Sequence, residues 1–266
     1  MHQPINEESY VRIDVHAHIG ISSELQVAGS ARDVVEIMDR NDIDQSIVSP
    51  IPGYEDPEGV ADSRRQNDNI AAALAEFPDR LPRGLGVVEP RHGKAALDEV
   101  DRVMRDLGLS GLMFHNDFNG LSIDSPAMFA IFERLAQYEG AIAQVHTAVH
   151  SVLEAPYQLG TLAAAFPSVT IINAHPFMDT THTRASIDLG QRFPNMLFDT
   201  CVSHQHLWGL EKAVESLGED RIMFGSDNPY FTYSADIDIV NYMNVSDEVK
   251  EKIFWKNAAR VFGLKN

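Results

Sequence analysis

Short apolar runs alternate with longer segments of helical periodicity along the chain, and eight such cycles can be counted. Most of the short runs are apolar throughout, which is typical of parallel strands buried on both faces. The predicted strands are Val11 to His16, Gln45 to Ser49, Gly84 to Glu89, Gly111 to His115, Ala141 to His146, Thr170 to His175, Met196 to Thr200 and Arg221 to Gly225.

Residues that end helices separate these cycles. Proline follows the helical segments at Phe77-Pro78, Phe166-Pro167 and Phe193-Pro194, and it disfavours a helical conformation in the residue before it. A last helix is expected from the N-cap Ser246 to Phe262. The other predicted helices are Ala31 to Arg40, Ser63 to Glu76, Ala95 to Leu107, Pro126 to Tyr138, Tyr157 to Phe166, Thr183 to Phe193 and Leu207 to Leu217.

Eight strand and helix units joined by right-handed crossovers predict an α/β fold, with a single (β/α)8 barrel. The 266 residues are close to the roughly 250 that such a barrel needs, so one domain over residues 1–266 is expected. An open, doubly wound sheet is the alternative.

Composition and charge narrow the set of partners. A net charge of −18 repels phosphate backbones and anionic lipids, so neither nucleic acid nor membrane is expected as a partner. The single cysteine, Cys201, cannot form an internal disulfide, which fits a reducing compartment. The first residues also lack the basic start and apolar run of a secretion signal. A cytoplasmic protein that binds a small-molecule substrate is expected.

Histidines and one aspartate gather at the predicted strand ends. His16 and His18 are two residues apart, so they share one face of a strand and can reach the same ion. In a (β/α)8 barrel the chemistry lies at the C-terminal ends of the strands. The residues at or just beyond these ends are His16, His18, His115, His146, His175 and Asp227.

Three imidazoles and a carboxylate suit a divalent metal ion. We expect His16, His18, His146 and Asp227 to bind one ion, and zinc, iron, nickel or cobalt would suit the imidazoles. His175 is expected to act as a general acid or base, because the pKa of histidine lies near neutral pH.

Several other residues are weaker candidates. His115 is expected either to bind substrate or to hydrogen-bond behind the metal site, and Asn228 to contact substrate. Arg64 could bind a carboxylate, although a solvated position at a helix start is the stronger expectation. Cys201 is expected to be a small buried apolar group rather than a nucleophile. Surface or loop positions are expected for His2, His92, His150, His182, His204 and His206.

Four motifs resemble those of the amidohydrolase superfamily, in the branch that includes aminocarboxymuconate-semialdehyde decarboxylase. The resemblance covers nearly the whole chain. The motifs are Asp14-Val15-His16-Ala17-His18, Gln144-Val145-His146, Ile172-Asn173-Ala174-His175-Pro176 and Met223-Phe224-Gly225-Ser226-Asp227.

The resemblance implies a (β/α)8 barrel with one divalent metal, usually zinc, that acts as a hydrolase or as a non-oxidative decarboxylase, and it makes a homodimer plausible. It assigns His16, His18, His146 and Asp227 to the metal and His175 to catalysis. Members with two metals often have a carboxylated lysine at the end of strand four, where this chain has His115. A single-metal site is therefore expected.

Two reactions fit the same residues. The short connection from Ile19 to Asp44 has little room for the insertions common among the decarboxylases. It favours a hydrolase in which a metal-activated water attacks a small, carboxylated lactone, ester or amide. The alternative is a decarboxylase. A phosphoesterase of the polymerase-and-histidinol-phosphatase type and a non-catalytic binding barrel are the less favoured alternatives.

Overall fold

The computed structural model describes residues 10–22, 26–53, 59–203 and 206–265. Its strands form two hydrogen-bonded sheets, in the orders β2-β1-β3-β4 and β5-β6-β7-β8-β9. All neighbouring strands are parallel except β1 and β2, which form an antiparallel hairpin. The strands are β1 (Ile13–Ser22), β2 (Val27–Gly29), β3 (Gln45–Pro50), β4 (Arg83–Gly84), β5 (Gly111–Phe114), β6 (Ile142–His146), β7 (Thr170–Ala174), β8 (Met196–Asp199) and β9 (Ile222–Met223).

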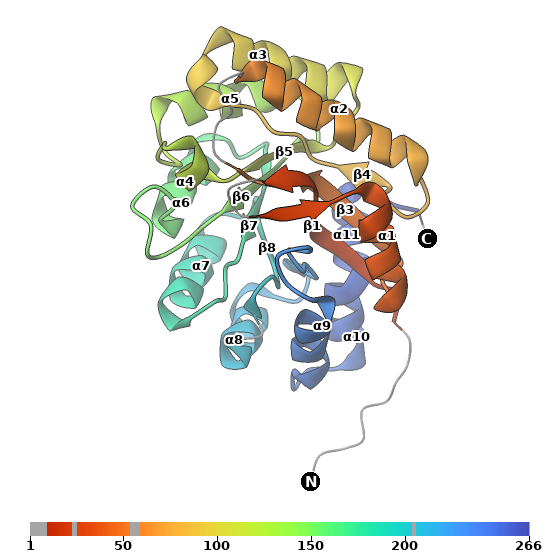
Figure 1. The fold of residues 1–266 in the computed structure, drawn as a ribbon. Helices are drawn as coiled ribbons and strands as arrows, with labels where there is room; N and C mark the ends of the chain where they lie inside the picture. Colours follow the sequence, from red (N-terminus) through yellow and green to blue (C-terminus); the bar gives the residue numbers. More distant parts are fainter. Residues whose placement is uncertain (1–9, 23–25, 54–58, 204–205, 266) are drawn as a thin grey trace.

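Backbone contacts close the two sheets into a barrel. On one side Gly86, just after β4, forms a parallel bridge with Leu112 of β5. On the other side Ala17 of β1 bridges in parallel to Asn228, beyond β9. The eight parallel strands therefore form a ring, with helices around it (Figure 1). This confirms the predicted (β/α)8 barrel and excludes the open sheet.

The helices follow the predicted order. Two of them, α1 and α8, have the predicted bounds, and most others agree within a few residues. Two helices continue as π-helical turns, η2 (Arg102–Asp106) after α3 and η4 (Lys252–Lys256) after α10. The helices are α1 (Ala31–Arg40), α2 (Val60–Glu76), α3 (Lys94–Asp101), α4 (Asn116–Asn119), α5 (Pro126–Leu135), α6 (Pro156–Ala165), α7 (Thr180–Arg192), α8 (Leu207–Leu217), α9 (Tyr233–Tyr242), α10 (Asp247–Glu251) and α11 (Asn257–Phe262).

Several elements differ from the prediction, including the short β2 and α4, which it lacks. Helix α9 is absent from it, because polar and apolar residues alternate from Asp236 to Ile239, a pattern with the period of a strand. The predicted strands at Gly84 to Glu89 and Arg221 to Gly225 shrink to two residues each, as β4 and β9. Their remaining residues still carry the bridges and backbone bonds that close the barrel.

The interior of the barrel is apolar at one end. Most strands contribute one buried aliphatic side chain to it, and α11 adds Ala258 and Phe262. A second, larger cluster fills the space between strands and helices. The polar groups of the strands therefore gather at the other, C-terminal end. Within the described residues, no helix is long and apolar enough to cross a membrane.

Gly111, at the start of β5, lies where β5 and β6 approach each other closely. A Cβ at this position would lie 1.8 Å from the carbonyl oxygen of Ile142 in β6. We expect Gly111→Ala to lower the free energy of unfolding by about 3 kcal/mol or more, because backbone must move to relieve the clash.

Gly108→Ala is the matched control. Gly108 also has a positive φ (65°), but nothing lies within 4 Å of the added Cβ. Its cost should be about 1 kcal/mol, from the left-handed backbone alone. Urea unfolding measures both, and equal losses would contradict the close approach of β5 and β6.

Candidate functional site

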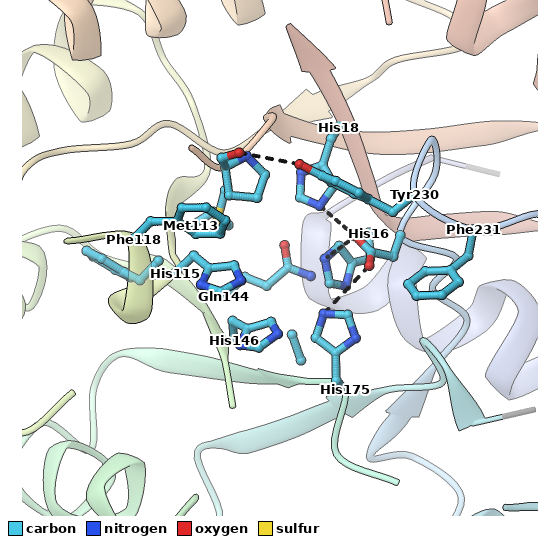
Figure 2. A pocket seen from close by; sticks show the side chains of 14 residues that line it. His16, His18, Met113, His115, Phe118, Gln144, His146, His175, Tyr230 and Phe231 are labelled. Carbon is cyan, nitrogen blue, oxygen red and sulfur yellow. Dashed lines mark hydrogen bonds and ion pairs between the residues drawn. The ribbon is translucent and has the colours of Figure 1, made fainter. Parts of the chain in front are cut away.

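A pocket of about 280 Å³ opens at the C-terminal end of the barrel strands (Figure 2). Histidines line its floor, and aromatic and apolar side chains line its walls. The lining residues are His16, His18, Pro52, Met113, Phe114, His115, Phe118, Gln144, His146, Ala174, His175, Asp227, Tyr230 and Phe231.

Three of the predicted metal ligands meet at one point of this pocket. His18 Nε2 lies 2.9 Å from Asp227 Oδ1, and His16 Nε2 lies 3.6 Å from the same oxygen. All three side chains are nearly inaccessible to solvent. Each offers one ligand atom within 4.8 Å of the other two, so a small cation can contact all three.

The opposite ring nitrogens of these histidines are already occupied. His16 Nδ1 lies 2.9 Å from Asp199 Oδ2. His18 Nδ1 lies 2.9 Å from Ser49 Oγ and 3.1 Å from the carbonyl oxygen of Pro50. Histidines that bind metals typically donate this second N–H to a carboxylate or a backbone carbonyl, which leaves Nε2 for the ion. The donor set therefore fits a divalent metal.

The charges of the site also favour a cation. Burial lowers the pKa of His16, but the carboxylates of Asp199 and Asp227 outweigh this effect and raise it to about 9. Burial raises the pKa of Asp227, yet its contacts with His18 and His16 bring it below the usual value. Ionised carboxylates thus hold a proton on His16, in a place where a metal ion could supply the positive charge instead.

His146 lies across the pocket from this group. Its ring stacks on that of His115, with centroids 3.9 Å apart and planes at 13°. The buried carboxylate of Glu154, in the loop between β6 and α6, lies 2.8 Å from Nδ1 of both histidines. The pKa of Glu154 would rise through burial, but its two histidine partners lower it strongly. The structure thus places His146 in the same pocket, with its Nδ1 occupied like those of His16 and His18.

His175 lies between the two groups. Its Nε2 is 3.9 Å from Asp227 Oδ2, and its ring is 4.6 Å from that of His146 and 5.0 Å from that of His16. Burial, followed by the neighbouring histidines, lowers the pKa of His175 well below its usual value. Its other nitrogen, Nδ1, lies 3.2 Å from the thiol of Cys201.

Cys201 is fully buried, as expected, and burial raises the pKa of its thiol well above the usual value. The sequence identified no basic group beside it, whereas the structure places the His175 ring in contact with its sulfur. Because the thiol stays protonated, this contact positions an imidazole rather than making the sulfur a nucleophile.

A buried carboxylate from β1 fixes the backbone of the site. Asp14 accepts hydrogen bonds from the backbone N–H of His16 (2.8 Å) and from both the N–H (3.1 Å) and the hydroxyl (2.7 Å) of Ser226. The N–H of Asp227 in turn donates to the carbonyl oxygen of His16 (2.7 Å). Gly225 allows this approach, because a Cβ there would lie 3.1 Å from the Cβ of His16.

Asp227 and His175 share an unusual backbone conformation. Each has φ of 59°, a left-handed value that costs a residue with a side chain free energy. In both cases the turn follows the end of a parallel strand. It directs the carboxylate and the imidazole toward the pocket that His16 and His18 also face.

Two predicted substrate contacts do not line the pocket. Arg64 lies on α2 with its side chain half exposed, and its Nε donates to the buried Glu99 (3.1 Å). Asn228 is buried, and its backbone pairs with β1. Arg64 therefore lies on a helix outside the pocket, and Asn228 helps to close the barrel.

His182 is not the surface or loop residue that was expected. It lies in the first turn of α7, is fully buried, and its Nε2 is 2.7 Å from the hydroxyl of Thr147, next to His146. Burial lowers its pKa to about 4. His2 and His204 lie outside the described residues.

The sequence missed the aromatic wall and the carboxylate of Glu154. Tyr230 and Phe231 follow Asp227 in the loop before α9, and Phe118 lies on the short helix α4. Glu154 is eight residues beyond His146 in a loop without periodicity. Each of these residues lies in a segment that follows a candidate site residue. This position could have identified them, because the loops at this end of a barrel form the site.

The sequence model of the family described as Amidohydrolase matches residues 13–264. Among curated proteins, 2-amino-3-carboxymuconate-6-semialdehyde decarboxylase of Dictyostelium discoideum is 30% identical over 113 residues, which are 41% of this chain and 31% of that protein's length. Gamma-resorcylate decarboxylase of Rhizobium sp. (strain MTP-10005) is 22% identical over 260 residues, 76% of each chain.

A solved structure of similar fold is a dihydroxybenzoic acid decarboxylase from Polaromonas sp. JS666 with bound manganese and the inhibitor 2-nitroresorcinol. Its TM-score is 0.74 at 17% identity, and the match covers 97% of this chain and 98% of that one. At this identity the likeness shows the fold. The bound manganese is a property of that decarboxylase.

Metal binding can be tested through thermal stability. Since an ion that binds only the folded chain stabilises it by about 3 kcal/mol at a hundred times its dissociation constant, Mn²⁺ or Zn²⁺ should raise Tm by about 5–10 °C. Asp227→Asn should abolish most of the shift. A shift of the same size in Asp227→Asn, or none in chelator-treated wild type, would count against the site.

His182 predicts a pH dependence of stability. Its folded pKa of about 4 lies below the ordinary value of 6.5, so the unfolded chain binds a proton more readily between these values. The stability from neutral His182 is present above pH 6.5 and is lost as pH falls toward 4, by about 3 kcal/mol.

His182→Gln keeps a nitrogen donor near Thr147 and does not titrate. Its free energy of unfolding should fall less steeply than that of the wild type between pH 6.5 and 4.5, as measured by urea unfolding at each pH. Parallel curves for the two proteins would show that His182 titrates normally.

Proposed function

Because the chain belongs to the amidohydrolase family, we propose that it is a metal-dependent, non-oxidative decarboxylase of a small carboxylated aromatic substrate. The decarboxylase activities of the similar proteins named above support this alternative over the hydrolase that the short connection after β1 favoured. We assign the ion to His16, His18 and Asp227, which lie together, and to His146 from across the same pocket. Manganese and zinc suit this donor set.

The observation that carries the proposal is the position of His175. Its Nε2 faces Asp227 at 3.9 Å, inside a pocket with apolar walls, while Cys201 occupies Nδ1. Nε2 is therefore the nitrogen that can pass a proton to a substrate beside the metal ligands. Decarboxylation requires such a group, because the carbon that loses carbon dioxide must gain a proton.

The pocket walls suit an aromatic ring. Met113 and Phe118 lie on one side and Tyr230 and Phe231 on the other, so a flat ring can pack between them (Figure 2). Neither lysine nor arginine is among the lining residues that the structure describes. A substrate carboxylate is therefore expected to be neutralised at the metal site, where a bound divalent ion supplies the positive charge.

The reaction follows from these positions. Protonated His175 would be a strong acid, because burial and the neighbouring histidines lower its pKa well below the usual value. The Nε2 proton passes to the ring carbon that carries the carboxylate. The bond between this ring carbon and the carboxylate carbon then breaks. Carbon dioxide leaves, and the electron pair of that bond stays with the ring.

The test is carbon dioxide release from 2,6-dihydroxybenzoate and other hydroxybenzoates by protein loaded with Mn²⁺ or Zn²⁺. His175→Ala should keep its metal content and lose about 10²- to 10⁴-fold in kcat, the usual contribution of a positioned acid. His150→Ala, at an exposed histidine outside the pocket, is the matched control and should keep its activity.

Lactones and amides in the same panel separate the two reactions. Acid release from these compounds without carbon dioxide from the benzoates would favour the hydrolase. Decarboxylation that survives His175→Ala unchanged would contradict the role given to His175.

A further inference from the structure

The proposed reaction leaves His115 without a role, although it lines the pocket at the end of β5. It lies beside His146 on the wall opposite Tyr230 and Phe231 (Figure 2). The edge of its ring also meets Phe118, with centroids 4.4 Å apart. The imidazole is thus a polar group set into the otherwise apolar wall where a substrate ring would pack.

Glu154 determines which nitrogen of His115 faces the pocket. Its fully buried carboxylate lies 2.8 Å from His115 Nδ1, and its other oxygen lies 2.8 Å from His146 Nδ1. Carboxylate oxygens accept hydrogen bonds, so the two contacts at 2.8 Å favour the hydrogen of each ring on Nδ1. In the neutral ring this leaves Nε2, on the far edge, with a free lone pair.

The stacking geometry argues against His115 as a ligand of the same ion. The two rings lie 13° from parallel at 3.9 Å, so the lone pairs on their outer nitrogens point nearly the same way. An ion about 2.1 Å from His146 Nε2 would then lie roughly 4 Å from His115 Nε2, too far to coordinate. Among the described residues, no hydrogen bond to His115 Nε2 is found either, and Nδ1 contacts Glu154 at 2.8 Å without the geometry of a full hydrogen bond.

We propose that His115 determines substrate specificity: its Nε2 accepts a hydrogen bond from a hydroxyl or amino group on the ring of the carboxylated substrate. The inference rests on the proposed function and names its substrate class more narrowly. A ring whose carboxylate faces His16, His18 and Asp227 extends toward this wall, where a donor meets the lone pair. A ring without a donor leaves Nε2 desolvated and unpaired, which weakens its binding.

The test measures binding rather than turnover. Dissociation constants for Mn²⁺-loaded protein are obtained by calorimetry for 2-, 3- and 4-hydroxybenzoate, each against the fluorobenzoate with the same substitution. Fluorine is close to hydroxyl in size and has no hydrogen to donate. In the wild type at least one hydroxybenzoate should bind about 3- to 10-fold more tightly than its fluoro partner.

His115→Phe should reduce that ratio to about one while it retains one equivalent of manganese, and His150→Phe, at an exposed position, should preserve it. Glu154→Gln provides a second variant, because one amide cannot accept from both histidines, and it should also lower the ratio.

A ratio that His115→Phe leaves unchanged, or no preference for any hydroxyl in the wild type, would overturn the inference. Loss of a second bound manganese in His115→Phe would also overturn it, because His115 would then be a metal ligand. Carbon dioxide release tests the proposed function separately, since these binding ratios do not depend on turnover.

Discussion

The buried carboxylate of Asp14 is the contact on which the site depends. It lies in the first strand and accepts hydrogen bonds from the backbone of His16 and from Ser226, 212 residues away. These bonds close the barrel between its first and last strands and bring Asp227 against His16 and His18. Burial raises the pKa of Asp14, and the donors around it offset part of this cost. The contacts that close the ring are therefore also the contacts that assemble the site.

The contacts behind the histidine ligands also depend on the packing of the barrel. Each candidate histidine ligand has its Nδ1 occupied, His16 by Asp199, His18 by Pro50 and Ser49, and His146 by Glu154. These partners come from three different elements, so the orientation of the imidazoles depends on the packing of the whole C-terminal end. A preorganised set of nitrogens loses little entropy when an ion binds, which is how a rigid barrel supports a metal site.

The strand ends are well predicted from the sequence, because hydrophobic periodicity and the residues that end helices depend on neighbouring positions in the chain. The eight apolar runs predict the barrel. The positions of the histidines and Asp227 at or just after these runs predict that they lie at one rim. Contacts made by loops are beyond this reasoning, since the position of Glu154 depends on how residues 147–155 fold back between β5 and β6. Arg64 shows the same limit: its charge alone does not show its partner, and on α2 its Nε donates to the buried Glu99.

Glu154 links two properties of the pocket that are usually considered separately. One carboxylate oxygen orients His146, a candidate metal ligand, and the other faces His115 on the substrate wall. A change in the loop after β6 that moves Glu154 would therefore alter both metal affinity and ring selection. Loops of (β/α)8 barrels vary more freely than strands, so new specificities would be expected to arise there. Here such variation is constrained, because the residue that selects the ring is oriented by the carboxylate that also orients the ligand.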